Sequence, residues 1–317
     1  MSWQNRFKRE FIQKPGEHLL NLGITGSGKT QDLIWILDAL RSGAPEETIL
    51  WNDAGKSNEL LLVGQFGPLH ILLPEGMDID ITSDYVEYTK TWFTDPADVW
   101  RSLERGKINV LCIEPFIRKP QYFTPVVTSI FSKLIDLAHD HHLPVPLSIF
   151  YDEFHRVAPG KGQAYDSKHA AFGAEIQYNI ETLRSLRVRF VASTHGWTKL
   201  RKGVRSSFNW FMINRGGSFT SSEQPRLSRY NKKYETLENN EAIIAFPDKV
   251  FTDIMEIPYY GEGWHYGQVH YSGKITPQNS PFIKQKKEVN RDDLQSIKDM
   301  LLKDLMGAGK ELVETTL

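Results

Sequence analysis

The sequence has a single cysteine, Cys112, among 317 residues. A disulfide framework and a cysteine-based zinc site within one chain are therefore excluded, and a reducing compartment is expected. No stretch approaches the roughly 18 consecutive apolar residues that would predict a membrane span. The sequence also lacks an excess of one charge, since its net charge is −1. Affinity for nucleic acid would therefore have to come from a local basic patch.

Targeting signals and repeats are missing as well. The first ten residues, MSWQNRFKRE, are basic, but no apolar run follows them, so we expect no signal peptide. We find no internal repeat and no low-complexity segment. With 40% hydrophobic and 24% charged residues, the composition is typical of a soluble globular protein that buries a sizeable core. These properties predict a cytoplasmic protein.

The strongest motif that is present is GITGSGKT at 23–30, which fits the phosphate-loop pattern G-x-x-x-x-G-K-[ST]. An apolar run precedes it, and leucines and isoleucines at helical spacing follow it, so the loop joins a strand to a helix. Such a loop holds phosphates with backbone N–H groups and with the positive end of the helix. Lys29 is expected to reach the β- and γ-phosphates, and Thr30 to coordinate Mg²⁺. The residues predicted to bind ATP are Gly23, Thr25, Gly26, Ser27, Gly28, Lys29, Thr30 and Gln31.

A second motif supplies the acidic groups that such a site needs. The run LSIFYDEFHR ends an apolar stretch with Asp152 and Glu153. Asp152 is expected to hold Mg²⁺ as a Walker B aspartate does, and Glu153 to orient and polarise the attacking water. A base beside the metal favours hydrolysis by water over phosphoryl transfer to a metabolite. We find no guanine-reading Asn-Lys-x-Asp motif, which favours an ATPase over a GTPase.

Apolar runs recur between helical patterns along most of the chain. Several show little alternation, which is typical of strands buried on both faces of a mainly parallel sheet. An α/β fold with helices on both faces of the sheet is therefore predicted. We assign 1–275 to one P-loop ATPase domain with a small β insertion at 76–95, and 276–317 to a linker or arm followed by an amphipathic C-terminal helix. The expected strands are 18–23, 48–51, 69–73, 108–113, 147–151, 189–193 and 210–214, with helical patterns at 96–105, 124–141 and 171–187.

These motifs together resemble those of the FtsK–HerA superfamily of DNA-pumping ATPases. GITGSGKT is similar to its phosphate loop, YDEFHRV to its Walker B segment, and ILWNDAGKSNE at 49–59 to a strand that ends in an aspartate and a Lys/Glu pair. VASTHG at 191–196 is similar to the next strand, where His195 takes the place of the family's sensor glutamine. Histidine can still donate a hydrogen bond to a γ-phosphate or a water. The resemblance implies a RecA-like core and a catalytic role for His195.

The resemblance also implies a ring, expected to be a hexamer, with nucleotides at the subunit interfaces. Such a ring needs an arginine finger from the neighbouring subunit to stabilise charge on the transferring phosphoryl group. We favour Arg187 and then Arg184, which precede the strand that leads to His195. A routine surface role for either arginine stays open.

Two segments are candidates for contact with nucleic acid. Residues 195–233 carry nine basic residues against one acid, a net charge of +8, which is the electrostatic signature of phosphate binding. The segment 157–169 directly follows the acidic pair and could move when the γ-phosphate leaves. A solvated basic face or contacts to an acidic neighbour remain alternatives. The predicted contact residues are Lys161, Lys168, Lys199, Arg201, Lys202 and Arg205.

We therefore expect an ATP-hydrolysing translocase of double-stranded DNA. The absence of a visible membrane segment or N-terminal barrel domain makes the genome-packaging ATPases of viruses the most similar branch. Capsid or membrane-associated portal proteins are then further candidate partners, and the host cytoplasm or the virion the expected location. A cellular or plasmid-borne HerA-like or conjugative translocase is the first alternative. A P-loop small-molecule kinase and a regulatory module that binds ATP without hydrolysing it are the others.

Overall fold

The computed structural model describes residues 2–56, 58–117, 119–261 and 267–276. Its main feature is a ten-stranded sheet in the order β11-β10-β9-β1-β8-β7-β2-β6-β3-β5. The strands from β9 to β5 are parallel to their neighbours, whereas β10 and β11 are antiparallel. The bounds are β1 Leu19–Leu22, β2 Thr48–Asn52, β3 Leu69–Pro74, β5 Tyr88–Phe93, β6 Ile108–Leu111, β7 Leu147–Tyr151, β8 Val188–Thr194, β9 Trp210–Asn214, β10 Glu241–Ala245 and β11 Met255–Glu256.

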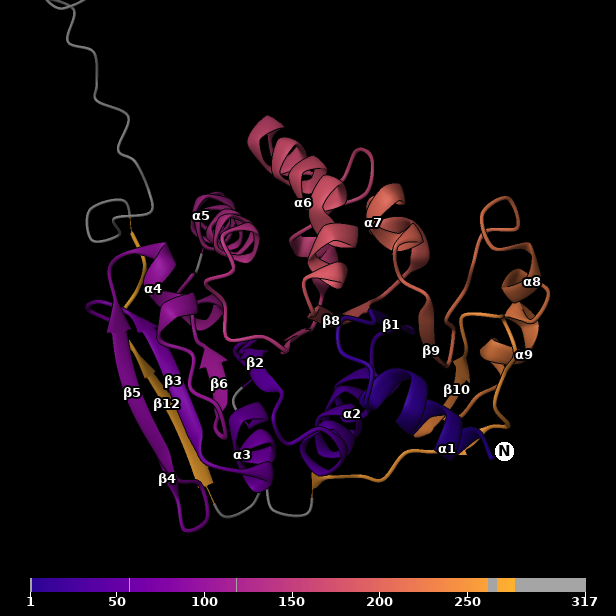
Figure 1. Ribbon diagram of the computed structural model, residues 1–317, viewed down its shortest axis with the longest axis horizontal. Helices are drawn as coiled ribbons and strands as arrows, with labels where there is room; N and C mark the ends of the chain where they lie inside the picture. The colour runs from indigo at the N-terminus through magenta and orange to yellow at the C-terminus, as the bar shows by residue number, and fades with distance from the viewer. Residues whose placement is uncertain (1, 57, 118, 262–266, 277–317) are drawn as a thin grey trace, which may run out of the picture. The chain divides into compact units, whose positions relative to one another are not determined.

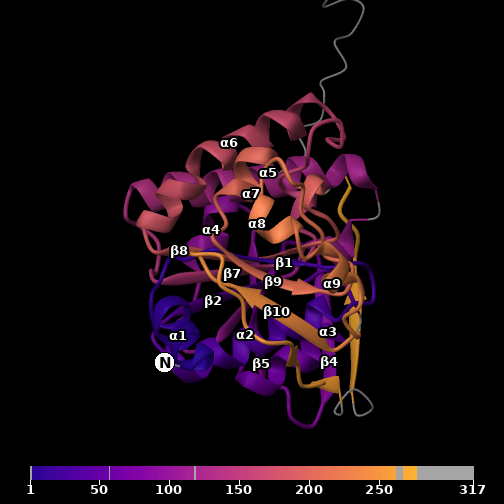
Figure 2. The same cartoon turned by 90° about the vertical axis from the view of Figure 1, so that its right-hand side faces the viewer.

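Helices cover both faces of this sheet (Figures 1 and 2). The helices α1, α2 and α3 lie on one face, and α4, α5, α6 and α7 lie on the other. Every residue of β1, β2, β7, β8 and β9 is buried, which explains why their sequences are apolar without alternation. The bounds are α1 Trp3–Phe7, α2 Lys29–Gly43, α3 Glu59–Val63, α4 Pro96–Arg101, α5 Pro120–His139, α6 Ser167–Ser185, α7 Lys202–Ser206, α8 Pro225–Ser228 and α9 Asn231–Glu235.

The predicted fold class is confirmed. A glycine-rich loop joins a central parallel strand, β1, to a helix, α2, that packs against β1 and β8. A mostly parallel sheet of this order between two helical layers is the RecA-like P-loop NTPase fold. Among the residues described, no helix combines the length and the apolar character needed to cross a membrane.

The segment 76–95 contributes to two different sheets. Strand β4, Asp78–Ser83, pairs antiparallel with β12, Gly267–Ser272, and these two form a small separate sheet. Strand β5 instead pairs parallel with β3 and extends the main sheet at its edge. The segment is thus shared between the two sheets, and its partner β12 comes from the far end of the described chain. The predicted C-terminal helix lies outside the described residues.

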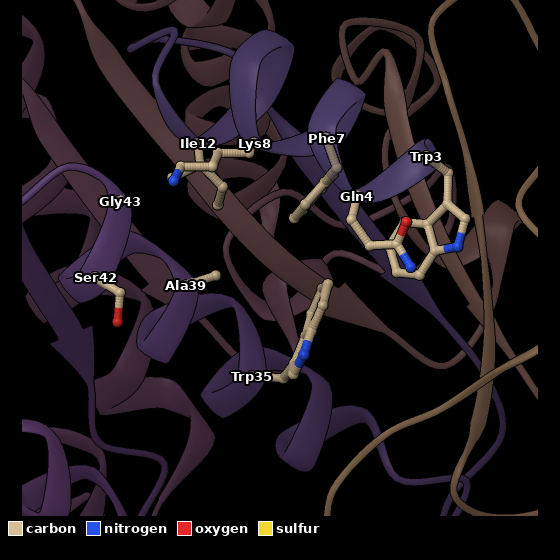
Figure 3. Close-up of a pocket in the computed structure, with 9 residues that line it drawn as sticks. All are labelled: Trp3, Gln4, Phe7, Lys8, Ile12, Trp35, Ala39, Ser42 and Gly43. Atoms are coloured by element: carbon tan, nitrogen blue, oxygen red, sulfur yellow. The ribbon is translucent and has the colours of Figure 1, made fainter. Parts of the chain in front are cut away.

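An apolar hollow lies between the N-terminal segment and α2 (Figure 3). Its volume is about 260 Å³, and its walls include Trp3, Phe7 and Ile12 on one side and Trp35 and Ala39 on the other. The rings of Phe7 and Trp35 stack with their centroids 5.5 Å apart. Lys8 is the one lining side chain that carries a charge. Among the described residues, no carboxylate and no histidine lines this hollow, which is separate from the cavity described below.

Candidate active site

The order of the central strands determines where the site forms. Strands β1, β8, β7 and β2 are adjacent and parallel, so their carboxyl ends meet at one edge of the sheet. The phosphate loop follows β1, His195 follows β8, and Asp152 and Glu153 follow β7. Lys56 comes soon after the end of β2. These residues line one cavity of about 370 Å³, together with Thr25, Gly26, Gly28, Thr30 and Gln31.

The phosphate loop has the backbone shape that its glycines allow. Gly26 and Gly28 adopt φ values of +77° and +96°, where residues with a side chain are strained. A Cβ atom at Gly28 would also lie 2.4 Å from the carbonyl oxygen of Asn239. Helix α2 begins at Lys29 and directs its positive N-terminal end at this loop. The loop therefore fits an anionic group such as a triphosphate.

The side chain of Lys29 is buried among acceptors. Its Nζ donates to the carbonyl oxygens of Gly23 and Ile24, at 3.0 and 2.9 Å. It also donates to Nδ1 of His195, at 3.0 Å. Burial lowers the pKa of Lys29, against the nearby charge of Asp152. Lys29 is thus fixed in position by groups that bind its ammonium head.

His195 connects Lys29 to Glu153. Because Nδ1 of His195 accepts from Lys29, its Nε2 carries the proton and donates to Oε1 of Glu153. Burial and the charge of Lys29 lower the pKa of His195, which favours this neutral form at pH 7. His195 therefore contacts both Lys29 and the predicted general base, Glu153. Its hydrogen bond to a γ-phosphate or a water stays a prediction.

Glu153 is held in an uncommon conformation. Its φ is +59°, in the left-handed region that a residue with a side chain rarely adopts. Its backbone N–H donates to Oδ1 of Asp152 and to Oγ of Ser193, each at 3.1 Å. Burial and the adjacent Asp152 carboxylate raise the pKa of Glu153. A carboxylate with a raised pKa, directed into the cavity, suits a general base.

Asp152 and Thr30 form the part of the site that would hold Mg²⁺. The Thr30 hydroxyl donates to Oδ2 of Asp152 at 3.4 Å, and Ser193 donates to Oδ1. Lys56 makes an ion pair with Oδ2 of Asp152 and donates to the Thr30 hydroxyl at 3.2 Å. Oδ2 of Asp152 and the Thr30 hydroxyl oxygen thus bind the cationic ammonium group of Lys56. The same two oxygens are suitable ligands for a metal ion. Although burial would raise the pKa of Asp152, Lys56, the Ser193 hydroxyl and Lys29 together hold that pKa below its usual range.

Replacing Lys56 with methionine is expected to tighten the binding of Mn²⁺ measured without nucleotide. The ammonium group and a divalent cation need the same two oxygens, and removing a repulsion of about 1 kcal/mol corresponds to about fivefold in affinity. Electron paramagnetic resonance of free and bound Mn²⁺ measures this change. Lys133→Met, on the exposed side of α5, is the control and should leave the affinity unchanged. Unchanged or weaker binding in Lys56→Met would contradict the shared position.

Three residues of the site were not among the predicted site residues. Lys56 follows β2, Ser193 lies in β8, and His155 has its Nε2 3.4 Å from Oε2 of Glu153. Lys56 belongs to the Lys/Glu pair of the segment 49–59, which supported the family resemblance. Lys56 itself was not predicted to lie in the site. Ser193 and His155 lie within the quoted motifs. The pairing of β7 with β8 brings Ser193 to the acidic pair, and the turn after β7 brings His155 to Glu153.

The two predicted finger arginines lie away from this cavity. Arg187 is exposed and precedes β8, whereas His195 follows it, and a seven-residue strand spans roughly 23 Å. Arg184, in the last turn of α6, makes an ion pair with Glu181 at 3.3 Å. The structure therefore does not bring either arginine to the site of its own chain. A role for them in the site of a second copy stays a prediction.

The two segments predicted to contact nucleic acid come together. Backbone hydrogen bonds join Gly160 to Lys199 and Arg201 to Ala158, at 2.7 and 3.0 Å. Between these segments lies a cavity of about 680 Å³. Four of the six predicted contact residues line it: Lys161, Arg201, Lys202 and Arg205. Lys168, exposed in the first turn of α6, does not line this cavity.

Two of the basic side chains have other roles in the structure. Arg205 is buried, makes a two-pronged ion pair with Glu223 at 2.7 and 2.6 Å, and packs over the ring of Trp197. Its charge is thus engaged by Glu223 within the fold, and its contact with nucleic acid stays a prediction. The charge of Lys199 helps to lower the pKa of His155 and of His195, so Lys199 lies near the candidate active site. The remaining cationic lining of the cavity is Lys161, Arg201 and Lys202.

No protein-family model matches the sequence, and no curated protein matches it. Solved structures do match. The genome-packaging NTPase B204 from Sulfolobus turreted icosahedral virus 2, in complex with AMPPCP, is 13% identical with a TM-score of 0.46, over 77% of this chain and 100% of that chain. Thermomonospora curvata EccC (ATPases 2 and 3), in complex with a signal sequence peptide, is 12% identical with a TM-score of 0.44, over 78% of this chain and 37% of that chain.

A third match is the pCW3 conjugation coupling protein TcpA with ATPγS, which is 13% identical with a TM-score of 0.40. It covers 77% of this chain and 62% of that chain. The first and third of these structures contain a nucleotide analogue, AMPPCP and ATPγS respectively.

Proposed function

We propose that this protein hydrolyses ATP and couples the hydrolysis to movement along double-stranded DNA. The observation that carries the proposal is the single cavity in which Lys29, Thr30, Asp152, Glu153 and His195 converge. A phosphate-binding lysine, a metal-binding pair and a base beside them are the parts that water attack on a γ-phosphate requires.

Each residue has a distinct part in this proposal. The loop amides and Lys29 bind and orient the β- and γ-phosphates, and Thr30 and Asp152 hold Mg²⁺, which neutralises charge on the phosphates when bound. Glu153 takes a proton from the attacking water at its carboxylate. His195 contacts both Lys29 and Glu153, so its position would change when a γ-phosphate binds or leaves.

Few residues separate the proposed general base, Glu153, from the basic cavity proposed to contact DNA. Glu153 is followed by the turn Phe154–Arg156, and the next residues lead directly to the cavity lined by Lys161, Arg201 and Lys202. An isolated bridge between Pro159 and Leu200 links this segment to the one that follows His195. A shift of Glu153 and His195 on loss of the γ-phosphate would therefore move both walls of the basic cavity. Three cations with no base-reading motif suit contact with the phosphate backbone in any sequence.

The proposal includes a homo-oligomeric ring, expected to be a hexamer, in which Arg187 or Arg184 of one copy reaches the site of the next. It also assigns the cargo as a viral genome that is packaged into a capsid, with capsid or portal proteins as docking partners. The resemblance of the motifs supports these finer assignments. A cellular or plasmid translocase would use the same site on a different cargo.

One set of measurements tests the proposal. ATP hydrolysis is measured with and without double-stranded DNA, and the mass in solution is measured with AMPPCP. We expect a ring whose hydrolysis rate rises with DNA. A monomer that ignores DNA and phosphorylates a metabolite would overturn the proposal in favour of a kinase. Binding of ATP without hydrolysis, with or without DNA, would indicate a regulatory module.

The variants Lys161→Ala and Lys202→Ala are expected to weaken binding to double-stranded DNA equally for unrelated sequences. Each lost phosphate contact should reduce the slope of log affinity against log salt concentration by about 0.9. Fluorescence anisotropy of labelled duplexes at several salt concentrations measures both effects. Lys133→Ala on α5, outside the cavity, is the matched control. A salt slope unchanged in both variants would show that DNA contacts the protein elsewhere.

A further inference from the structure

A second, smaller cavity adjoins the phosphate loop. Its volume is about 230 Å³, and it shares Gly26, Gly28 and Gln31 with the cavity of the candidate active site. Apart from Asp32 of α2, the rest of its wall comes from two later segments of the chain, with the residues Asn239, Asn240, Ile257, Pro258 and Tyr259. The proposed hydrolysis mechanism uses none of these five residues.

The position of the proposed catalytic groups determines on which side of the phosphate loop the γ-phosphate lies and on which side the nucleoside lies. Lys56, Asp152, Glu153 and His195 line the first cavity and are absent from the lining of the second. The γ-phosphate of a bound nucleotide must lie beside the general base, Glu153, and the metal-binding pair, Thr30 and Asp152. The nucleoside must then leave the loop on the side away from them. Through Gly26, Gly28 and Gln31, the second cavity opens from the loop without sharing the catalytic groups.

The segments around this cavity are tied to the phosphate loop. The N–H of Tyr260 donates to the side-chain oxygen of Gln31 at 2.8 Å, and the N–H of Ile257 donates to the carbonyl oxygen of Asn240 at 2.7 Å. The carbonyl oxygen of Asn239 lies so close to Gly28 that any Cβ there would clash. These contacts fix the wall relative to the loop, as a preformed ligand site requires.

The wall has the chemistry of a site for a flat heterocycle. Tyr259 is 65% exposed, and its ring lies against Gly261, where a Cβ would approach ring atoms to 2.3 Å. Ile257 and Pro258 add apolar surface beside it. The side-chain amides of Asn239 and Asn240 each offer donors and an acceptor. A nucleobase has two apolar faces for stacking and a polar edge for such amides.

We infer that this cavity binds the purine base of the nucleotide, with Tyr259 as the residue on which the base stacks. The inference rests on the proposed function, because it assumes that the phosphate loop holds a nucleoside triphosphate. A purine offers a larger stacking surface than a pyrimidine, so affinity should decrease from ATP and GTP to CTP and UTP. The asparagine amides can present a donor or an acceptor and therefore suit either purine.

The test compares a ligand that has a base with one that has only phosphates. AMPPCP and inorganic tripolyphosphate, each with Mg²⁺, are titrated calorimetrically into the wild-type protein and into Tyr259→Ala and Tyr259→Phe. Tyr259→Ala should weaken AMPPCP binding about tenfold, the equivalent of about 1.4 kcal/mol of stacking, and leave tripolyphosphate binding within twofold. Tyr259→Phe keeps the ring and should bind AMPPCP as the wild type does. Tyr178→Ala, at an exposed tyrosine of α6, is the control for a lost surface ring.

The outcomes separate this inference from the proposed function. If Tyr259→Ala binds AMPPCP and tripolyphosphate as the wild type does, the base lies elsewhere and the inference is wrong. If Tyr259→Ala loses both ligands equally, Tyr259 supports the loop and does not contact the base, which also overturns the inference. If the wild type binds neither ligand, the proposed function itself fails.

Discussion

Glu153→Gln is expected to slow ATP hydrolysis by at least about 100-fold, because a positioned general base typically contributes 10²–10⁴-fold. Glutamine has nearly the same shape and can still accept a hydrogen bond from Nε2 of His195, so the site should keep its geometry. It cannot accept a proton from water at neutral pH. The affinity for ATP should stay within about threefold, because the phosphate loop and Lys29 are unchanged. Single-turnover hydrolysis and calorimetric binding of ATP measure the two quantities separately.

The matched control for this variant is Glu181→Gln, which makes the same chemical change on the exposed side of α6. It should hydrolyse ATP at the wild-type rate. A Glu153→Gln variant that also keeps the full rate would show that another group activates the water. His195 and Asp152 would then be the next candidates. Loss of ATP binding in Glu153→Gln would instead show that Glu153 organises the loop.

The parts of the site that the sequence predicts are those encoded by continuous segments. The phosphate loop between a strand and a helix, and the acidic pair after an apolar run, each combine a motif with its local structural context. Lys29 and Asp152 were expected to share one site because a phosphate loop needs an acidic group that holds the metal. His195 was placed by the resemblance of VASTHG to a strand of the FtsK–HerA superfamily. These three positions depend on short continuous motifs.

The features that the sequence did not predict depend on contacts between distant segments. Arg205 is a basic residue in a basic stretch and was therefore predicted to contact DNA. Only the structure shows that its charge is paired with Glu223. Among the aromatic residues of the basic stretch, Trp197, Phe208 and Trp210 are buried in the core and cannot stack with bases, whereas Tyr230 is exposed. Tyr259 lies beside the phosphate loop although about 230 residues separate them. No local pattern contains these pairings.

A third arginine of the same region shows how burial decides a role. Arg189 lies in β8 close to the proposed fingers, but its side chain is fully buried. Its Nε lies 3.3 Å from Oε1 of Glu47, and its Nη2 donates to the carbonyl oxygens of Ile12 and Lys14, at 3.3 and 3.1 Å. The guanidinium group also packs over the ring of Phe11. Arg189 therefore connects the N-terminal segment to the edge of the sheet opposite the active site.

Glu47→Ala is accordingly expected to destabilise the fold by about 3–5 kcal/mol, because it leaves the buried guanidinium of Arg189 without its counter-charge. The free energy of unfolding from urea titrations measures the loss. Glu46→Ala, at the exposed neighbouring glutamate, is the control and should change that free energy by less than about 0.5 kcal/mol. The double variant Glu47→Leu with Arg189→Met removes both charges and should recover most of the stability, since apolar replacement of a buried ion pair is often neutral. If Glu47→Ala and the double variant were equally unstable, the loss would come from packing around Ser148 and Phe11 and not from an unpaired charge.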